Sequence, residues 1–278
     1  MEISDTKALI EELAVKIGMN KGAVVIWDNN RIRRYPSLTD ITPIIRDRTI
    51  LNQLEFEEIS KTPLLEIPIQ SSKIICLAKN YPDHAKEMGV EPKHLPPHPD
   101  LFLKPKSALI GPGDNVIFPS QAQQVDHEVE LAIVISKRGK NIPIEESKKY
   151  IFGYTILLDM TARDIQAVAK KKGRPWFAAK GFDSFAPIGP VIVTYDEIIN
   201  PQNLDLELKI NNELKQKGNT RDMIFNIEQI VSYCSTITTL EPGDLIATGT
   251  PAGVGPIQRG DKICATIESI GTLEVGVI

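Results

Sequence analysis

Residues Val125–Ile135 read V-D-H-E-V-E-L-A-I-V-I, an apolar run that two glutamates interrupt. Side chains of a β-strand alternate between its two faces, so Glu128 and Glu130, two apart, point to the same side. Such a pair usually faces solvent. Here Val129 and Leu131 leave no clean polar face, which predicts a strand buried on both sides. Two like charges on one face of a buried strand are costly unless something cationic lies between them.

A third carboxylate belongs to the same pattern. Asp159 ends the apolar run Tyr154–Leu158, and a segment rich in polar residues follows it. Three carboxylates that converge from two strands form an oxygen site that suits magnesium, manganese or calcium. We therefore predict Glu128, Glu130 and Asp159 as ligands of a divalent cation, with a solvated acidic face as the alternative.

A histidine and a glutamate follow an earlier predicted strand, Lys73–Leu77, in the segment A-K-N-Y-P-D-H-A-K-E-M-G. His84 and Glu87 are three residues apart, so a helix places them on one face. A carboxylate beside an imidazole raises its basicity and fixes its tautomer, as a general base requires, although such pairs also occur on exposed helices. The proline-rich stretch 90–100 is predicted to be a surface loop that acts as a lid over this pair.

Composition excludes several classes of protein. The chain has 278 residues and a net charge of −4, which gives no sign of a nucleic-acid footprint. No apolar run approaches membrane-spanning length, and the acidic N-terminus does not read as a targeting peptide. Three widely spaced cysteines without a C-x-x-C pattern indicate buried thiols in a reducing cytoplasm. Twenty prolines and eighteen glycines favour a mostly β fold with some α-helix and many turns.

Spacing of apolar residues predicts two domains. Residues 1–70 form a small N-terminal α+β domain without chemistry of its own, and residues 71–278 form the domain that holds the candidate site. The predicted N-terminal elements are a helix Lys7–Ile17, a hairpin Ala23–Trp27 with Ile32–Tyr35, and helices Leu38–Arg48 and Thr49–Ile59. Later helices are predicted at Ile144–Tyr150, Thr161–Lys172 and Met223–Thr239. The glycine-rich loop Thr248–Gly255 lacks G-K-[ST], which argues against a nucleotide phosphate site.

Six motifs then occur in a fixed order, and together they are specific. They are N-Y-P-D-H-A-K-E-M-G, L-F-L-K-P, D-H-E-V-E-L-A-I-V-I, L-D-M-T-A-R-D-I-Q, G-R-P-W-F-A-A-K and A-T-G-T-P-A-G-V-G. In these motifs the chain resembles the fumarylacetoacetate hydrolase (FAH) superfamily over roughly residues 70–278. The likeness is greatest to the acylpyruvase branch, whose members also act as oxaloacetate decarboxylases.

This resemblance implies a rolled mixed β-sheet in the catalytic domain, and a homodimer. It implies that Glu128, Glu130 and Asp159 bind Mg2+ or Mn2+, with Ca2+ as a further option. The remaining roles are also implied by the resemblance: His84 and Glu87 as a water-activating dyad, Lys180 as a catalytic lysine, Arg163 and Gln166 as substrate contacts, and Thr250 as a holder of the substrate carboxylate. Lys79 departs from the relatives, many of which have a neutral residue or arginine there.

The implied reaction is cleavage of a carbon–carbon bond in an acylpyruvate, a 2,4-dioxo acid such as fumarylpyruvate or acetylpyruvate, giving pyruvate and a carboxylic acid. Three other reactions of the superfamily stay open: decarboxylation of oxaloacetate, decarboxylation or isomerisation in aromatic catabolism, and dehydration of a 2-keto-3-deoxy sugar acid. An alternative of another class is a non-catalytic metal- or ligand-binding homologue. The retained dyad, lysine and three carboxylates argue against that alternative.

Overall fold

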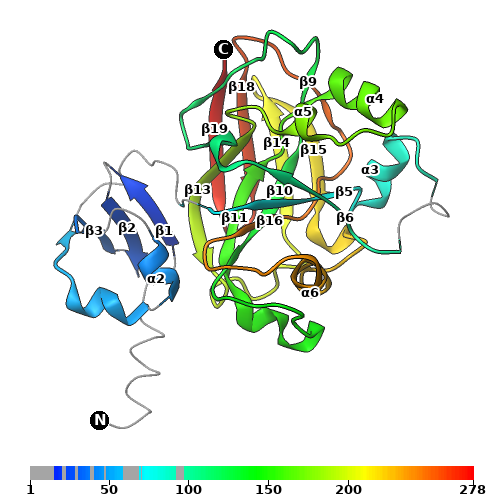
Figure 1. Cartoon of the computed structure of the whole chain (residues 1–278). Helices are drawn as coiled ribbons and strands as arrows, with labels where there is room; N and C mark the ends of the chain where they lie inside the picture. Colours follow the sequence, from blue (N-terminus) through cyan, green and yellow to red (C-terminus); the bar gives the residue numbers. More distant parts are fainter. Residues whose placement is uncertain are drawn as a thin grey trace.

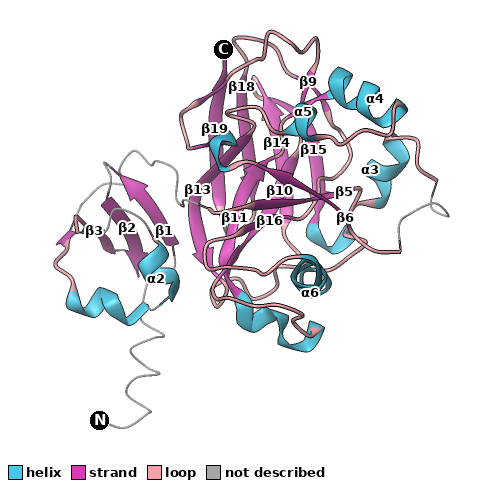
Figure 2. Ribbon diagram, viewed as in Figure 1, coloured by secondary structure: helices cyan, strands magenta, loops and turns pink. Residues whose placement is uncertain are grey.

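A computed structural model of the chain describes residues 16–20, 23–28, 31–37, 41–46, 48–58, 69, 71–91 and 97–278. Strands dominate these residues, and helices are short and lie outside the sheets (Figure 2). The largest sheet is mixed and curls around a continuous apolar core. The expectation of a mostly β fold with a rolled mixed sheet is confirmed.

The largest sheet of the described chain has its strands in the order β4-β3-β2-β1-β13-β11-β10-β16-β5-β6, with β7 beside β13. Its strands are β1 (Lys16–Asn20), β2 (Ala23–Asp28), β3 (Arg31–Tyr35), β4 (Glu57–Glu58), β5 (Ile74–Ala78), β6 (Asp100–Lys104), β7 (Leu109–Ile110), β10 (Val129–Ile135), β11 (Ile151–Leu158), β13 (Ala186–Thr194) and β16 (Leu245–Ala247). Most neighbours are antiparallel, while β5 and β16 run parallel. Every residue of β10 and β11 is buried, which confirms that the strand after Glu128 is covered on both faces.

A second sheet packs against the first. It has the order β15-β14-β18-β19-β8 and consists of β8 (Asn115–Val116), β14 (Asp205–Ile210), β15 (Glu213–Asn219), β18 (Lys262–Ile267) and β19 (Gly271–Val277). Its strands contact the large sheet through the pairs β13 with β19, β10 with β14 and β11 with β18. A small sheet of β9 (Val125–His127), β12 (Thr161–Ala162) and β17 (Gly255–Pro256) lies where both sheets end. Apolar residues that alternate along β14 and β18 point into the space between the sheets, as a period of two requires.

The described residues also form short α-helices and 3₁₀ turns. They are α2 (Thr42–Arg46), α3 (Pro82–Glu87), α4 (Arg163–Lys171), α5 (Phe177–Lys180) and α6 (Ile227–Ile237), with short 3₁₀ turns η1 (Arg48–Gln53), η3 (Lys106–Ala108), η4 (Ile144–Tyr150) and η5 (Thr220–Asp222). Figure 1 shows α3, α4 and α5 at one end of the molecule, away from α6. An Asn226–Gln229 capping box begins α6, because each side chain bonds the other residue's backbone N–H.

The N-terminal predictions have mixed outcomes. The hairpin of β2 and β3 is confirmed. The helix expected over Lys7–Ile17 lies mostly outside the described residues, and its last two residues belong to strand β1. In place of a helix over Thr49–Ile59, the chain forms the 3₁₀ turn η1 and the short strand β4. Strand β1 pairs with β13, so these strands continue the large sheet.

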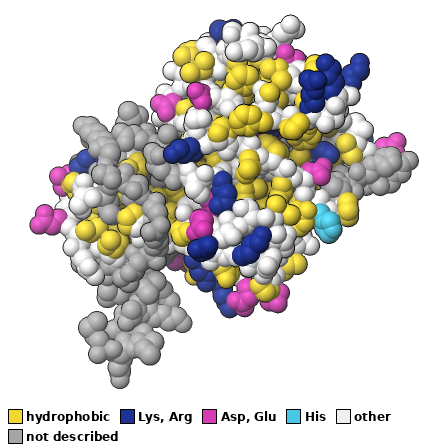
Figure 3. Space-filling model, in the orientation of Figure 1, with side chains coloured by type: hydrophobic (Ala, Val, Ile, Leu, Met, Phe, Trp, Pro, Cys, Tyr) yellow, Lys and Arg dark blue, Asp and Glu magenta, His cyan; other side chains and the backbone are white. Residues whose placement is uncertain are grey.

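A shallow apolar groove lies beside the edge strand β6. Leu103, Phe177 and Ile237 line it, and each keeps about half or more of its surface exposed. Figure 3 shows hydrophobic side chains spread between charged ones on the face of the molecule seen in Figure 1. No helix in the part of the chain that the structure describes is both long enough and apolar enough to span a lipid bilayer.

Candidate active site

The three carboxylates of the sequence pattern meet at the end of the central strands. Glu128 lies at the break between β9 and β10, Glu130 follows in β10, and Asp159 comes directly after β11. These two strands pair with Val129 opposite Leu158, and the Asp159 N–H donates to the Glu128 carbonyl over 2.9 Å. One oxygen from each carboxylate lies within 4.8 Å of the others, and all three residues are buried. The register of one strand pair therefore brings the predicted ligands together.

Two cations that line the pocket, Lys180 and Arg163, pair with this cluster. Lys180 at the end of α5 places Nζ 3.0 Å from Glu128 Oε2 and also pairs with Asp159. Arg163 begins α4 and donates to Asp126, to Gln166 and to Glu128. Burial would raise the pKa of Glu128, but Lys180 and Arg163 outweigh it and hold that pKa well below its usual range. Burial would lower the pKa of Lys180, yet Asp159 and Glu128 raise it to about 12, so Lys180 is an ammonium at neutral pH.

Glu130 is the carboxylate that the cations leave uncompensated. Its Oε2 accepts from the Gly249 N–H over 2.7 Å, and within the described residues no lysine or arginine forms an ion pair with it. Burial, and then the charges of Asp159 and Glu128, raise its pKa above the usual range. A buried, uncompensated carboxylate beside two others fits a divalent cation, because hard cations take several carboxylate oxygens. The donor set therefore fits the predicted metal.

Lys104, the last residue of β6, is a site residue that the sequence analysis did not assign. Its buried ammonium lies 2.8 Å from Asp159 Oδ1 and donates to the backbone carbonyls of Met160 (2.9 Å) and Lys180 (2.6 Å). It thus connects the carboxylate strand to the helix that carries Lys180. The available signal was a lysine at the end of an apolar strand, in the motif L-F-L-K-P.

The predicted dyad is present on α3. His84 Nδ1 lies 3.2 Å from Glu87 Oε2, and Glu87 Oε1 accepts from the Gly253 N–H over 3.1 Å. Burial lowers the pKa of His84, against the opposing charges of Glu128 and Glu87, so the imidazole is neutral at pH 7. With Nδ1 donating to Glu87, Nε2 has a free lone pair. The pair has the geometry of a general base held by a carboxylate.

Asn80 fixes the backbone at the start of helix α3. Its Nδ2 donates to the carbonyls of Phe225 (3.1 Å) and Thr248 (2.8 Å), and its Oδ1 accepts from the Phe225 N–H (2.8 Å). The residue is fully buried. The start of the dyad helix is therefore attached to the loop before α6 and to the loop after β16.

The other predicted contacts also lie at the site, in partly different arrangements. Gln166 accepts from Arg163 over 2.7 Å and lies on the inner face of α4. The Thr250 hydroxyl donates to the Val129 carbonyl over 2.8 Å and accepts from Gln216 over 2.8 Å. Gln216 in turn contacts His127 Nδ1 at 2.9 Å. Thr250 thus holds the strand that carries two of the carboxylates, and its contact with substrate remains a prediction.

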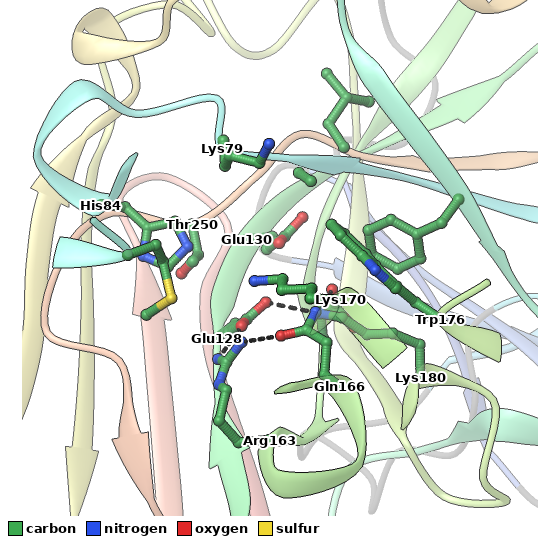
Figure 4. A pocket seen from close by; sticks show the side chains of 15 residues that line it. Lys79, His84, Glu128, Glu130, Arg163, Gln166, Lys170, Trp176, Lys180 and Thr250 are labelled. Carbon is green, nitrogen blue, oxygen red and sulfur yellow. Dashed lines mark hydrogen bonds and ion pairs between the residues drawn. The ribbon is translucent and has the colours of Figure 1, made fainter. Parts of the chain in front are cut away.

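Eight of the nine predicted site residues line one pocket (Figure 4), and Glu87 is not among its lining residues. Its wall contains His84, Glu128, Glu130, Asp159, Arg163, Gln166, Lys180 and Thr250 from the sequence analysis, together with Leu77, Ala78, Lys79, Met88, Phe102, Lys170 and Trp176. Of these, Lys170 and Trp176 face the site from α4 and from the turn before α5. Trp176 lies inside the motif G-R-P-W-F-A-A-K, whereas Lys170 lies between two motifs and has no individual signal in the sequence.

Comparisons with known proteins identify the family of the chain. The family described as "Fumarylacetoacetate (FAA) hydrolase C-terminal" matches residues 73–278. The mitochondrial oxaloacetate tautomerase FAHD1 of Arabidopsis thaliana is 44% identical over 208 residues, which cover 75% of this chain and 92% of that protein.

Two solved structures are similar as well. The fumarylpyruvate hydrolase of Pseudomonas aeruginosa, in complex with Mn2+ and pyruvate, is 35% identical with a TM-score of 0.72 and matches 79% of this chain and 94% of that chain. The maleylpyruvate hydrolase of Sphingobium sp. SYK-6, in complex with manganese(II) and pyruvate, is 34% identical with a TM-score of 0.77, over 95% and 98% of the two chains. By its sequence, its fold and the match over residues 73–278, the chain belongs to the fumarylacetoacetate hydrolase family.

Proposed function

We propose that this protein is a Mg2+- or Mn2+-dependent hydrolase that cleaves acylpyruvates to pyruvate and a carboxylic acid. The observation that carries the proposal is the pocket itself, in which His84, hydrogen-bonded to Glu87, lines the same cavity as three buried carboxylates and Lys180. The manganese and pyruvate bound by two similar hydrolases support this assignment.

The dyad provides the base. His84 Nε2 takes a proton from a water molecule, which attacks the 4-carbonyl carbon of the substrate, while Glu87 holds the imidazole through Nδ1. The bond between C3 and C4 then breaks, so the acyl group leaves as a carboxylic acid and the other fragment becomes the enolate of pyruvate. That enolate takes a proton and gives pyruvate, so one water is consumed for each bond broken.

The opposite wall stabilises negative charge. Lys180 presents an ammonium to the region where the enolate develops, and Arg163 holds Glu128 in place. Glu128, Glu130 and Asp159 would hold the divalent cation, which supplies a Lewis acid for the carboxylate and 2-oxo group of the substrate. Lys104 keeps Asp159 oriented from behind.

The first test is pyruvate release from acetylpyruvate, measured with Mg2+, with Mn2+ and with EDTA. We expect turnover that depends on the cation and that Glu130→Ala and Asp159→Ala abolish. Near-normal turnover of either variant with unchanged magnesium dependence would show that the ligand assignment is wrong. No release of pyruvate from acetylpyruvate or from fumarylpyruvate under any condition would remove the hydrolase assignment.

A second candidate is a reaction on oxaloacetate, favoured by the similarity to oxaloacetate tautomerases. Tautomerisation and decarboxylation both pass through an enolate and need no attacking water. We therefore expect His84→Ala to reduce acetylpyruvate hydrolysis more than either oxaloacetate reaction. Turnover of oxaloacetate alone would make that reaction the function. If neither acetylpyruvate nor oxaloacetate is turned over, an aromatic-pathway isomerisation or the dehydration of a sugar acid becomes the favoured reaction. A protein that binds Mg2+ but turns over none of these substrates would be a non-catalytic homologue.

The assembly and location stay proposals. We propose a homodimer acting in the cytoplasm, in keeping with its free, mostly buried cysteines and the apolar groove beside β6. Sedimentation of the native protein beside a Leu103→Lys variant tests whether that groove joins two copies. A native protein that sediments as a monomer would contradict the dimer.

A further inference from the structure

Helix α4 lines the pocket along its length. Arg163, Gln166 and Lys170 are spaced by three and four residues, so they lie on one face of the helix, and all three line the cavity. Seven residues of helix rise by about 10 Å, so Lys170 lies that far along the axis from Arg163, which touches Glu128. The two ends of this face therefore line different parts of the pocket.

Lys170 is held at the mouth of the pocket. Its ammonium lies 5.1 Å from the centre of the Trp176 ring, and this ring packs against Phe102 at 6.0 Å. Across residues 71–91 and 97–278 no carboxylate forms an ion pair with it. Lys79, which also lines the pocket (Figure 4), differs because Asp100 Oδ2 lies 2.9 Å from its ammonium. Within the described part of the chain, Lys170 is thus a positioned cation without a carboxylate in ion-pair contact.

The charges that line the pocket also distinguish Lys170 from the other cations. Of the cations that line it, Lys79 pairs with Asp100, Arg163 with Asp126 and Glu128, and Lys180 with Glu128 and Asp159. Among the described residues, Lys170 is the lining cation whose charge no ion pair balances. Burial first, and then repulsion by Arg163 and Lys180, lower the pKa of Lys170, while the charge of Glu128 opposes that shift. An anion beside Lys170 would relieve that repulsion.

We propose that Lys170 binds a second carboxylate, at the end of the substrate remote from the 2-oxo acid group. This inference rests on the acylpyruvase assignment. It predicts that the protein prefers 2,4-dioxo acids with a carboxylate on the acyl chain over those with a neutral acyl group, such as acetylpyruvate. The head of the substrate meets Lys180 and the carboxylate cluster, and its tail meets Lys170.

The test is a binding measurement that needs no turnover. Calorimetry in Mg2+ compares 2-oxoglutarate with 2-oxopentanoate, which share the 2-oxo acid head and the chain length but differ in the terminal carboxylate. We expect the native protein to bind 2-oxoglutarate about five- to tenfold more tightly, as one partly exposed charged contact provides. Lys170→Met, which keeps a flexible apolar stem against Trp176, should bring the ratio close to one, and Lys170→Arg should restore most of it.

Lys171→Met is the matched control, because Lys171 is the next lysine of α4 and does not line the pocket. It should leave the ratio as in the native protein. Equal affinities of the native protein for the two acids, or an unchanged ratio in Lys170→Met, would overturn the inference. A ratio that collapses equally in Lys171→Met would also overturn it, because the effect would then be general charge.

Failure of the inference and failure of the proposed function are distinguishable. Cleavage of acetylpyruvate with equal affinity for the two probe acids would keep the hydrolase and remove the subsite. A preference for 2-oxoglutarate that depends on Lys170, without cleavage of any 2,4-dioxo acid, would keep the subsite and remove the hydrolase. If both hold, the ratio of kcat/KM for fumarylpyruvate over acetylpyruvate should fall in Lys170→Met, mainly through KM.

Discussion

Lys104 supports the site from outside the pocket, so its removal tests the support separately from the chemistry. Replacement by methionine leaves the Asp159 carboxylate and two carbonyls without their shared donor. Breaking a buried ion pair by removing one partner costs about 3–5 kcal/mol. We expect Lys104→Met to lower the free energy of unfolding by that amount in urea denaturation with EDTA.

The loss should be smaller when Mg2+ is present, because a cation at the cluster neutralises the Asp159 charge that Lys104 no longer balances. Lys106→Met serves as the control, since Lys106 is exposed on η3. An equal loss with and without Mg2+ would show that Lys104 acts through the two carbonyls alone.

His84 gives the site a pH dependence with a defined direction. Its ordinary pKa of 6.5 is lowered by burial, and the Glu87 hydrogen bond and charge oppose that shift. Protonation of His84 removes the base, so activity falls on the acid side as pH drops through this pKa. Glu87→Gln removes an opposing contribution, lowers the pKa further and should move the acid limb of kcat/KM to lower pH.

Asp83→Asn removes the same charge from the same helix at an exposed position and should leave the acid limb in place. If the limb of Glu87→Gln stays at the pH of the native protein, a group other than His84 controls it.

At the scale of elements, the loop after β16 must fit closely against the dyad helix. Gly249 has φ of +93°, and a Cβ there would lie 2.7 Å from the Cβ of Asn80. Its N–H is also the donor to Glu130. We expect Gly249→Ala to destabilise the protein and to reduce pyruvate release, because both contacts shift together.

Gly260→Ala is the control that separates backbone strain from the steric contact with Asn80. Gly260 has nearly the same φ, +92°, with nothing within 4 Å of an added Cβ. The free energy of unfolding of this variant should fall by about 1–2 kcal/mol, which is the cost of alanine in a left-handed backbone conformation, and its activity should not change. Equal thermal shifts and equal activities of the two variants would show that the contact with Asn80 is unimportant.

Elements with strong periodicity were predictable from sequence, and groups joined only by tertiary contact were not. The run from Val129 to Ile135 is buried on both faces as expected, because an unbroken apolar pattern admits few alternatives. Lys104 and Lys170 were missed, since neither has a partner close in sequence that would mark it. Residues 49–59 were wrongly predicted as a helix, because a short apolar run fits a helix and a strand equally well.

At the scale of the molecule, every residue of the proposed site lies beyond residue 70. We propose that residues 1–70 form a separate unit and that a chain starting at residue 71 retains catalysis. Removal of β1 exposes the edge of β13 at Ile192 and Val193. We therefore expect kcat near that of the full chain, with lower thermal stability and greater aggregation from the unpaired edge.

Thermal unfolding and pyruvate release of the shortened chain provide the measurement. For a domain of this size each kcal/mol lost lowers Tm by about 2–4 °C, so a modest loss is detectable. A shortened chain that stays folded and binds Mg2+ but no longer turns over substrate would give the first 70 residues a part in catalysis.

Asn80 has a consequence for how such proteins diverge. Its bonds to Phe225 and Thr248 fix the backbone where the chain leaves the sheet, before the dyad helix and the loop that follows. Substitutions or insertions beyond α3 can therefore accumulate over generations without displacing the carboxylates. A new acyl group can be accommodated by changes in that loop and at Lys170, because the bonds of Asn80 keep the start of α3 in place.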